Sequence, residues 1–170
     1  MHSVFTIGML LDQRVWDSSA QRDCGRIQTV YFDDRLSTLA AISLGRRWPW
    51  SPLRIIMASD MCWREERIEI RDGAVIVEQQ PAMTWLDWRN LRRRIVATDQ
   101  QLVGRIDDVM CAADGVIEYL ITYGRSLWDV MIIDRQTVLQ IGSTGLPMTV
   151  AVMPQRRGYV VQQSDVMNST

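Results

Sequence analysis

The chain has 170 residues, of which 47% are hydrophobic and 23% charged, and its formal net charge is -1. A near-zero net charge provides no field that would steer the chain to nucleic acid, so we expect no DNA partner. All 19 basic residues are arginine, and the absence of lysine excludes Schiff-base chemistry and a P-loop lysine. The one histidine is His2, which excludes an internal Ser-His or Cys-His pair and a multi-histidine metal site. We therefore expect a protein that is not an enzyme and that needs no metal or cofactor.

The predicted strands of the first half follow an extended entry and a polar turn. They are short segments rich in β-branched and aromatic residues, separated by turn residues. Asp33-Asp34 suits a hairpin turn, Gly45 ends the strand before it, and Asp72-Gly73 suits a final hairpin. The predicted strands are residues 14–17, 27–32, 39–44, 55–57, 67–70 and 74–77.

A segment of different composition, residues 81–93, separates these strands from a second set. A helical turn or two is expected within it at 84–88. In the second set, Asp114-Gly115 suits a hairpin turn and Gly124 ends a strand. The predicted strands are residues 94–96, 106–111, 116–121, 130–133, 148–152 and 159–161.

The two sets of strands form an internal repeat. Cys24-Gly25-Arg26-Ile27 recurs 79 residues later as Val103-Gly104-Arg105-Ile106, and we extend this register without a gap to Gly45 and Gly124. Further on, residues 54–56 resemble 131–133, and 75–80 resemble 158–163. The sequence therefore predicts a first repeat at 1–80, a connector at 81–93, and a second repeat with a C-terminal tail at 94–170.

Each repeat resembles the PRC-barrel family, named for the cytoplasmic domain of the photosynthetic reaction-centre H subunit. The second copy carries the resemblance best, in residues 102–109, Asp114-Gly115 and 117–121. The resemblance implies an all-β fold of two tandem small PRC-type β-barrels with few short helical turns. It also implies docking to a larger assembly, since the family includes the C-terminal module of the ribosome maturation factor, which binds a small-subunit ribosomal protein.

The tryptophans are the strongest candidates for a docking surface. In Trp48-Pro49-Trp50 two indoles flank a proline in a loop between strands, where we expect an exposed anchor for a partner; the alternative is a loop folded over a barrel end. Trp128 is its counterpart in the second repeat. Trp85 and Trp88 in the connector could fill an interface between the barrels, whereas Trp16 and Trp63 fit the core.

The clustered arginines are the second group of candidates. They could bind carboxylates, phosphates or lipid headgroups, with a solvated face as the alternative. The adjacent carboxylates at Asp33-Asp34, Glu65-Glu66 and Asp107-Asp108 point to opposite faces of a strand or lie in turns, so they do not form an acid-base pair. The arginines concerned are Arg46, Arg47, Arg92, Arg93, Arg94, Arg156 and Arg157.

The remaining sulfur-containing residues fit the interior. Cys24, Cys62 and Cys111 form no CxxC pair and are expected as small apolar residues in a reducing compartment. Six methionines occupy apolar positions and are expected to fill gaps in the core: Met9, Met57, Met61, Met110, Met131 and Met148.

The leading functional hypothesis is a non-catalytic structural or accessory subunit, or an assembly factor. We expect no signal peptide, and no stretch of the sequence approaches the roughly 18 apolar residues needed to span a bilayer. We therefore expect a cytoplasmic protein, peripheral on the cytoplasmic side of a membrane complex. The resemblance to PRC-barrels implies, most concretely, a photosynthetic reaction centre as the partner, through its H subunit or antenna proteins. The alternative is a ribosome-maturation-type adaptor that binds a ribosomal protein or RNA.

Overall fold

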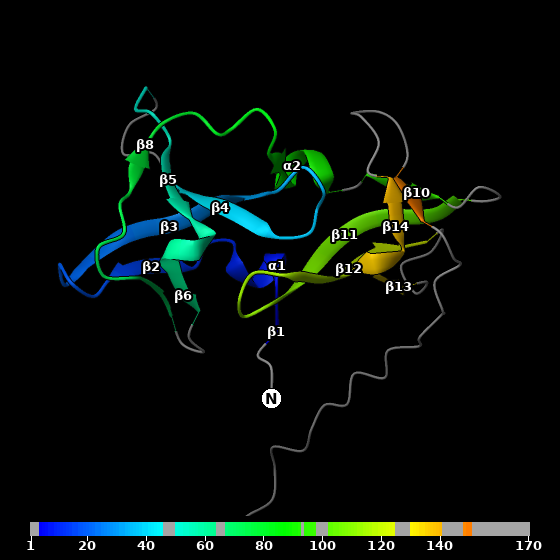
Figure 1. The fold of residues 1–170 in the computed structure, drawn as a ribbon, viewed down its shortest axis with the longest axis horizontal. Helices are drawn as coiled ribbons and strands as arrows, with labels where there is room; N and C mark the ends of the chain where they lie inside the picture. Colours follow the sequence, from blue (N-terminus) through cyan, green and yellow to red (C-terminus); the bar gives the residue numbers. More distant parts are fainter. Residues whose placement is uncertain are drawn as a thin grey trace, which may run out of the picture.

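The fold is built mainly from β-strands, as the composition and turn spacing predict. The computed structural model describes residues 4–45, 50–63, 67–92, 94–97, 102–124, 130–140 and 148–150. Among these residues 59% lie in strands and 11% in helices, which confirms the all-β class. The strands form two sheets that lie side by side, with two short helices, α1 (Ile7–Leu10) and α2 (Trp88–Leu91), between them (Figure 1).

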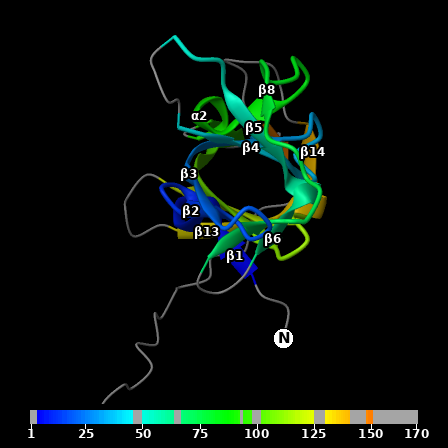
Figure 2. The same cartoon turned by 90° about the vertical axis from the view of Figure 1, so that its left-hand side faces the viewer.

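The first sheet has the strand order β6-β7-β2-β3-β4-β5-β8, and β9 pairs with β3 beside this path. The sheet curves strongly when viewed from its own end of the molecule (Figure 2). Neighbours are antiparallel except for β2 and β7, which pair in parallel. Its strands are β2 (Arg14–Asp17), β3 (Arg22–Phe32), β4 (Leu39–Leu44), β5 (Arg54–Met57), β6 (Met61–Trp63), β7 (Ile68–Ile70), β8 (Val77–Glu78) and β9 (Leu86–Asp87).

The second sheet has the order β13-β12-β11-β10-β15-β14, and β1 pairs with β11 beside this path. Here β10 and β15 form the parallel pair. The 3-10 turns η1 (Ala58–Asp60) and η2 (Arg135–Thr137) follow equivalent strands in the two sheets. The strands are β1 (Val4–Thr6), β10 (Ile95–Ala97), β11 (Leu102–Ala112), β12 (Ile117–Tyr123), β13 (Val130–Asp134), β14 (Val138–Gln140) and β15 (Met148–Val150).

Corresponding strands pair in the same way in the two sheets. Val15 lies opposite Gly25, and Val96 lies opposite Gly104. In both sheets the register shifts directly after that valine. The glycine at the start of each sequence repeat therefore occupies the same position in each sheet.

The ungapped alignment of the two copies is wrong beyond the first hairpin. It equates Ala41 with Leu120, whereas Val30 pairs with Ile42 and its counterpart Val109 pairs with Leu120. The reason is a shorter turn. The Asp33 N–H donates to Thr38 O in the first hairpin, but the Ala112 N–H donates to Val116 O in the second, one residue closer in sequence. A slip of one residue would place the whole strand on the opposite face.

The two sheets are joined by a strand that crosses between them. β1 precedes β2 of the first sheet but pairs with β11 of the second, whereas β9 follows β8 and pairs with β3 of the same first sheet before α2 leads to the second. The hairpin turns also meet, since the Leu39 N–H donates to Gly115 O at 2.8 Å and the Ile117 N–H to Ser37 O at 2.9 Å. One continuous buried cluster includes residues of both sheets and both helices.

The last predicted hairpin of the first repeat is wrong. β7 pairs with β2 and β6, and the segment after Gly73 supplies β8, which pairs with β5. β7 has three buried residues in a row, which suits a strand covered on both faces rather than one half of an exposed hairpin. The corresponding expectation for residues 159–161 lies outside the described residues.

The methionine expectations are confirmed in part. Met61, Met131 and Met148 are buried, but Met9 and Met57 are exposed, the first at 63% of its surface. Met9 faces outward because only Ile7 and Leu10 of the four-residue α1 reach the core. Cys24 and Cys111 are buried as expected, and Cys62 is half-buried.

Candidate docking surface

The first sheet has apolar side chains on both faces. Neighbouring residues of a strand point to opposite faces, so Phe32 and Ile42 enter the main core while Tyr31, Ala41 and Ile55 form a separate cluster on the other side. We call the latter the outer cluster. Leu53 and Trp85 pack against it. An antiparallel sheet with one face on the core usually presents polar residues on the other, so this apolar outer face is notable.

Exposed apolar side chains continue from the outer cluster at the β5–β8 side of the sheet. Met57 lies opposite Ala41 and Val77 lies opposite Ile55, so both share the face of the outer cluster. The Gln79 N–H donates to Leu53 O at 3.1 Å and extends the pairing past β8. We define the outer-face patch as Met57 and Val77, which lie on this face, together with the exposed apolar residues within five residues of β5 or β8 in sequence: Trp50, Val75 and Met83.

The loop before β5 presents the tryptophan predicted to be an anchor. Trp50 exposes 79% of its surface, which agrees with the expectation for this loop. The β5–β8 pair lies at the upper left of Figure 1. Trp48 in the same motif lies outside the described residues.

The two tryptophans of the predicted connector have internal contacts. Trp88 is 4% exposed and packs edge to face on Phe32, with ring centroids 6.3 Å apart. The ring centroids of Trp85 and Tyr31 lie 5.9 Å apart, and Trp85 packs against the outer cluster. Trp88 therefore belongs to the interior, where α2 meets β3, and of these two tryptophans only Trp85 packs against the outer cluster.

The structure describes few of the clustered arginines. Arg92 is exposed, whereas Arg94 is half-buried, and this burial lowers the pKa of its guanidinium. The triplet is therefore not a uniform solvent-facing row. The other candidates lie outside the described residues: Arg46, Arg47, Arg93, Trp128, Arg156 and Arg157.

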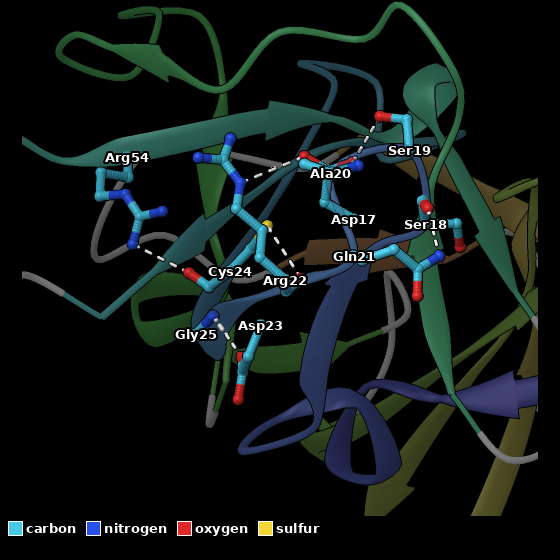
Figure 3. Close-up of polar contacts among 10 residues, drawn as sticks. All are labelled: Asp17, Ser18, Ser19, Ala20, Gln21, Arg22, Asp23, Cys24, Gly25 and Arg54. Carbon is cyan, nitrogen blue, oxygen red and sulfur yellow. Dashed lines mark hydrogen bonds and ion pairs between the residues drawn. The ribbon is translucent and has the colours of Figure 1, made fainter.

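Two isolated arginines that the sequence did not single out bind backbone carbonyl groups. Arg54 of β5 donates to Cys24 O at 2.9 Å, across the sheet from its own strand (Figure 3). Arg135 of η2 donates to the carbonyl oxygens of Arg35 and Leu36 in the first hairpin turn. Both arginines link segments that are far apart in sequence, and a local sequence pattern does not predict such contacts.

The acidic pairs have structural partners rather than a shared site. Asp33 accepts from the backbone N–H groups of Ser37 at 2.6 Å and Thr38 at 3.1 Å, closing the hairpin turn. Asp108 accepts from the Gly8 N–H at 3.1 Å and so connects α1 to β11. Glu65 and Glu66 lie outside the described residues. In the part of the chain that the structure describes, no three His, Cys, Asp or Glu side chains lie close enough together to hold a metal.

Most of the outer-face patch was not predicted from the sequence. The signal was present in part, because consecutive apolar residues in a strand, such as Ile55 and Ile56, require apolar surroundings on both faces. Val75 and Val77 were expected in a hairpin with β7, which would have placed them elsewhere. No helix in the described ranges is long and apolar enough to span a membrane.

No protein-family model matches the chain, and a search of curated proteins finds no match.

Proposed function

We propose that this chain is a non-catalytic docking protein that binds a protein subunit of a larger complex through the outer-face patch. The observation that carries the proposal is the apolar outer face of the first sheet, which continues into exposed side chains. Large aromatic and methionine side chains are enriched at protein interfaces. An exposed indole beside apolar strands has the character of a residue that contributes most of the binding energy when a partner encloses it.

The more specific form of the proposal rests on the resemblance to PRC-barrels. It places the chain as an accessory subunit or assembly factor at the cytoplasmic side of a membrane complex, in contact with the H subunit or antenna proteins of a photosynthetic reaction centre. The arginine clusters would add contacts to carboxylates or lipid headgroups at the rim of such an interface.

The test is purification of the tagged full-length chain from its native cells after mild solubilisation of membranes. We expect reaction-centre subunits to be retained by the wild-type chain. Trp50→Ala should weaken retention by roughly 30-fold, because truncation of a central interface tryptophan typically costs about 2 kcal/mol or more. Leu139→Ser is the matched control, since Leu139 on β14 is 67% exposed but lies on the second sheet.

The outcomes separate the alternatives. Ribosomal particles in place of membrane subunits, bound in a salt-sensitive manner, would assign the chain to the adaptor class. Equal loss in Trp50→Ala and Leu139→Ser, or a lowered melting temperature in Trp50→Ala, would remove the outer-face patch as the docking site. Absence of any retained complex would overturn the docking function itself.

A further inference from the structure

The two long strands, β3 and β11, are preceded in the chain by the same series of elements. β1 and α1 lead into β2, and β9 and α2 lead into β10. The Ile27 N–H donates to the oxygen of Gln13, which follows α1, at 2.9 Å. The Ile106 N–H donates to the oxygen of Arg94, which follows α2, also at 2.9 Å. Because Ile27 and Ile106 are equivalent positions of the repeat, the first arm, which is β1 with α1, corresponds to the second arm, which is β9 with α2.

Each arm pairs with the long strand that follows the other arm. In the first arm, Phe5 of β1 lies opposite Cys111 of β11. In the second arm, Leu86 of β9 lies opposite Phe32 of β3. Phe32 and Cys111 are equivalent positions, since they are separated by the same 79 residues as the repeated glycines. The two arms therefore dock at the same place on β3 and β11, but each on the strand that belongs to the other repeat.

The two helices also bring equivalent apolar side chains into the core. Ile7 and Leu10 of α1 are buried, as are Trp88 and Leu91 at the corresponding positions of α2. Both helices lie between the two sheets (Figure 1), and their buried side chains belong to the one continuous cluster. Each arm is therefore held by apolar burial as well as by main-chain pairing.

The second residue of each helix donates its backbone N–H to an aspartate. In α1, Gly8 donates to Asp108 of β11, at 3.1 Å to Oδ1 and 3.2 Å to Oδ2. In α2, Arg89 donates to Oδ1 of Asp87 at 2.7 Å. The same oxygen accepts from the Thr29 hydroxyl of β3 at 3.4 Å. A carboxylate thus satisfies an N–H that the helix start leaves free in both arms, but it comes from the receiving strand in the first contact and from the arm in the second.

The positions opposite these aspartates are occupied by threonines. Thr6 of the first arm corresponds to Asp87 of the second, and Thr29 of β3 corresponds to Asp108 of β11. Thr6 lies near the same N–H, since a Cβ on Gly8 would lie 3.9 Å from Thr6 Oγ1 and 2.8 Å from Asp108 Oδ2. Each contact therefore contains one threonine and one aspartate, in opposite order. Two aspartates would repel each other and two threonines would lack the carboxylate, so these two orders are the compatible ones.

We infer that the contact between arm and strand is an interface between two copies of one folding unit, residues 4–70 and 86–150, and that the partner of each unit is the other unit of the same chain. Each unit supplies a strand and a helix to the other, as two subunits do when they exchange an identical element. Residues 86–91 then belong to the second unit rather than to a connector. This interface is separate from the outer-face patch, so either proposal can fail without the other.

The test is to exchange threonine and aspartate within each contact of the full-length chain. Asp108→Thr removes the carboxylate and should lower the melting temperature by about 2–4 °C, the shift typical of a lost helix cap in a chain of this size. Thr6→Asp places two carboxylates together and should lower the melting temperature as well. The double variant Thr6→Asp/Asp108→Thr copies the second contact and should recover most of either loss. The reciprocal double variant Asp87→Thr/Thr29→Asp should recover in the same way relative to its own single substitutions.

The matched control is Thr6→Asp/Asp34→Thr. It has the same composition and net charge as the first double variant, but it changes an exposed aspartate in the β3–β4 turn. The control should stay as unstable as Thr6→Asp alone. A double variant that is no more stable than this control, or Asp108→Thr with the melting temperature of the wild type, would overturn the inference.

Cleavage between the units tests their pairing without any substitution in the contacts. A protease site inserted after Met83, which is fully exposed, leaves each arm with its own unit. The two fragments should elute together from a size-exclusion column as a one-to-one complex, whereas fragments that separate would contradict the pairing. An intact chain that forms dimers, and loses them in Asp108→Thr, would assign the interface to pairing between chains and overturn the intramolecular partner.

Discussion

At the scale of single residues, Gly25 and Gly104 occupy equivalent positions of the repeat, but glycine is needed there for two different physical reasons. Gly25 has a φ of 113°, a conformation that other residues adopt at a cost. Gly104 has no positive φ, but a Cβ there would lie 2.3 Å from the carbonyl oxygen of Tyr123. The first glycine is required by its backbone conformation and the second by the close approach of a neighbouring strand.

These two requirements predict unequal tolerance among glycines. Gly104→Ala should destabilise the chain by about 1–3 kcal/mol because the Tyr123 backbone must move, and Gly25→Ala by about 1–2 kcal/mol because of the left-handed φ. Gly45→Ala is the control, since a Cβ at Gly45 would meet no other described atom within 4 Å. Chemical denaturation gives the three free energies of unfolding. A Gly104→Ala protein as stable as Gly45→Ala would contradict the predicted clash.

At the scale of elements, the β2–β3 hairpin is organised by a carboxylate in its turn. Asp17 accepts from the Ser19 hydroxyl at 2.7 Å, the Ala20 N–H at 3.0 Å and Arg22 Nε at 3.3 Å (Figure 3). The Ser19 hydrogen bond is the largest cause, and together these contacts lower the pKa of Asp17 below its ordinary value of 3.8. The ionised carboxylate therefore holds the turn together.

A pH dependence follows from this arrangement. Because the pKa of Asp17 is lower in the folded than in the unfolded state, its contribution is present above pH 3.8 and is lost as the pH falls through the lower folded value. Asp17→Asn should lower the melting temperature at neutral pH and reduce the further fall in acid. The check is thermal unfolding at pH 7 and at pH values below 3.8. Asp34→Asn, at an exposed carboxylate in the β3–β4 turn, should retain the wild-type profile.

The sequence was most informative about strands that pair with their neighbours in sequence and least informative about strands that pair with distant segments. Alternation and turn residues placed β3, β4, β11 and β12, because hairpins join neighbouring segments. The one-residue slip between repeats was missed because both turns are polar and their lengths differ by only one residue. The partners of β8 and β9 and the crossing of β1 were missed because pairing between distant segments leaves no periodic signal. Trp50 was found from the Trp-Pro-Trp motif in a loop, whereas Met57 and Val77 required the register of β5 and β8.

At the scale of the whole molecule, the crossing of β1 and the contacts between the sheets make them parts of one folded unit. β1 pairs with β11 of the second sheet. Phe5 of β1 also stacks on Trp63 of the first sheet, with ring centroids 4.9 Å apart. α2 carries Trp88 into the core against Phe32, and Arg135 ties η2 to the first hairpin turn. Separation of the sheets would break main-chain pairing, ring contacts and part of the continuous buried cluster together.

The chain should therefore unfold in one transition despite its repeat. Ile42 and Leu120 occupy equivalent positions and are both fully buried. Ile42→Ala and Leu120→Ala should each destabilise the fold by about 2–5 kcal/mol, and each should move a single calorimetric transition to lower temperature by about 2–4 °C for each kcal/mol. Calorimetric and van't Hoff enthalpies should agree in both variants, as they do for one cooperative unit. If instead each substitution moved one of two resolved transitions and left the other in place, the sheets would fold independently, and the contacts between them would contribute little to the stability of either.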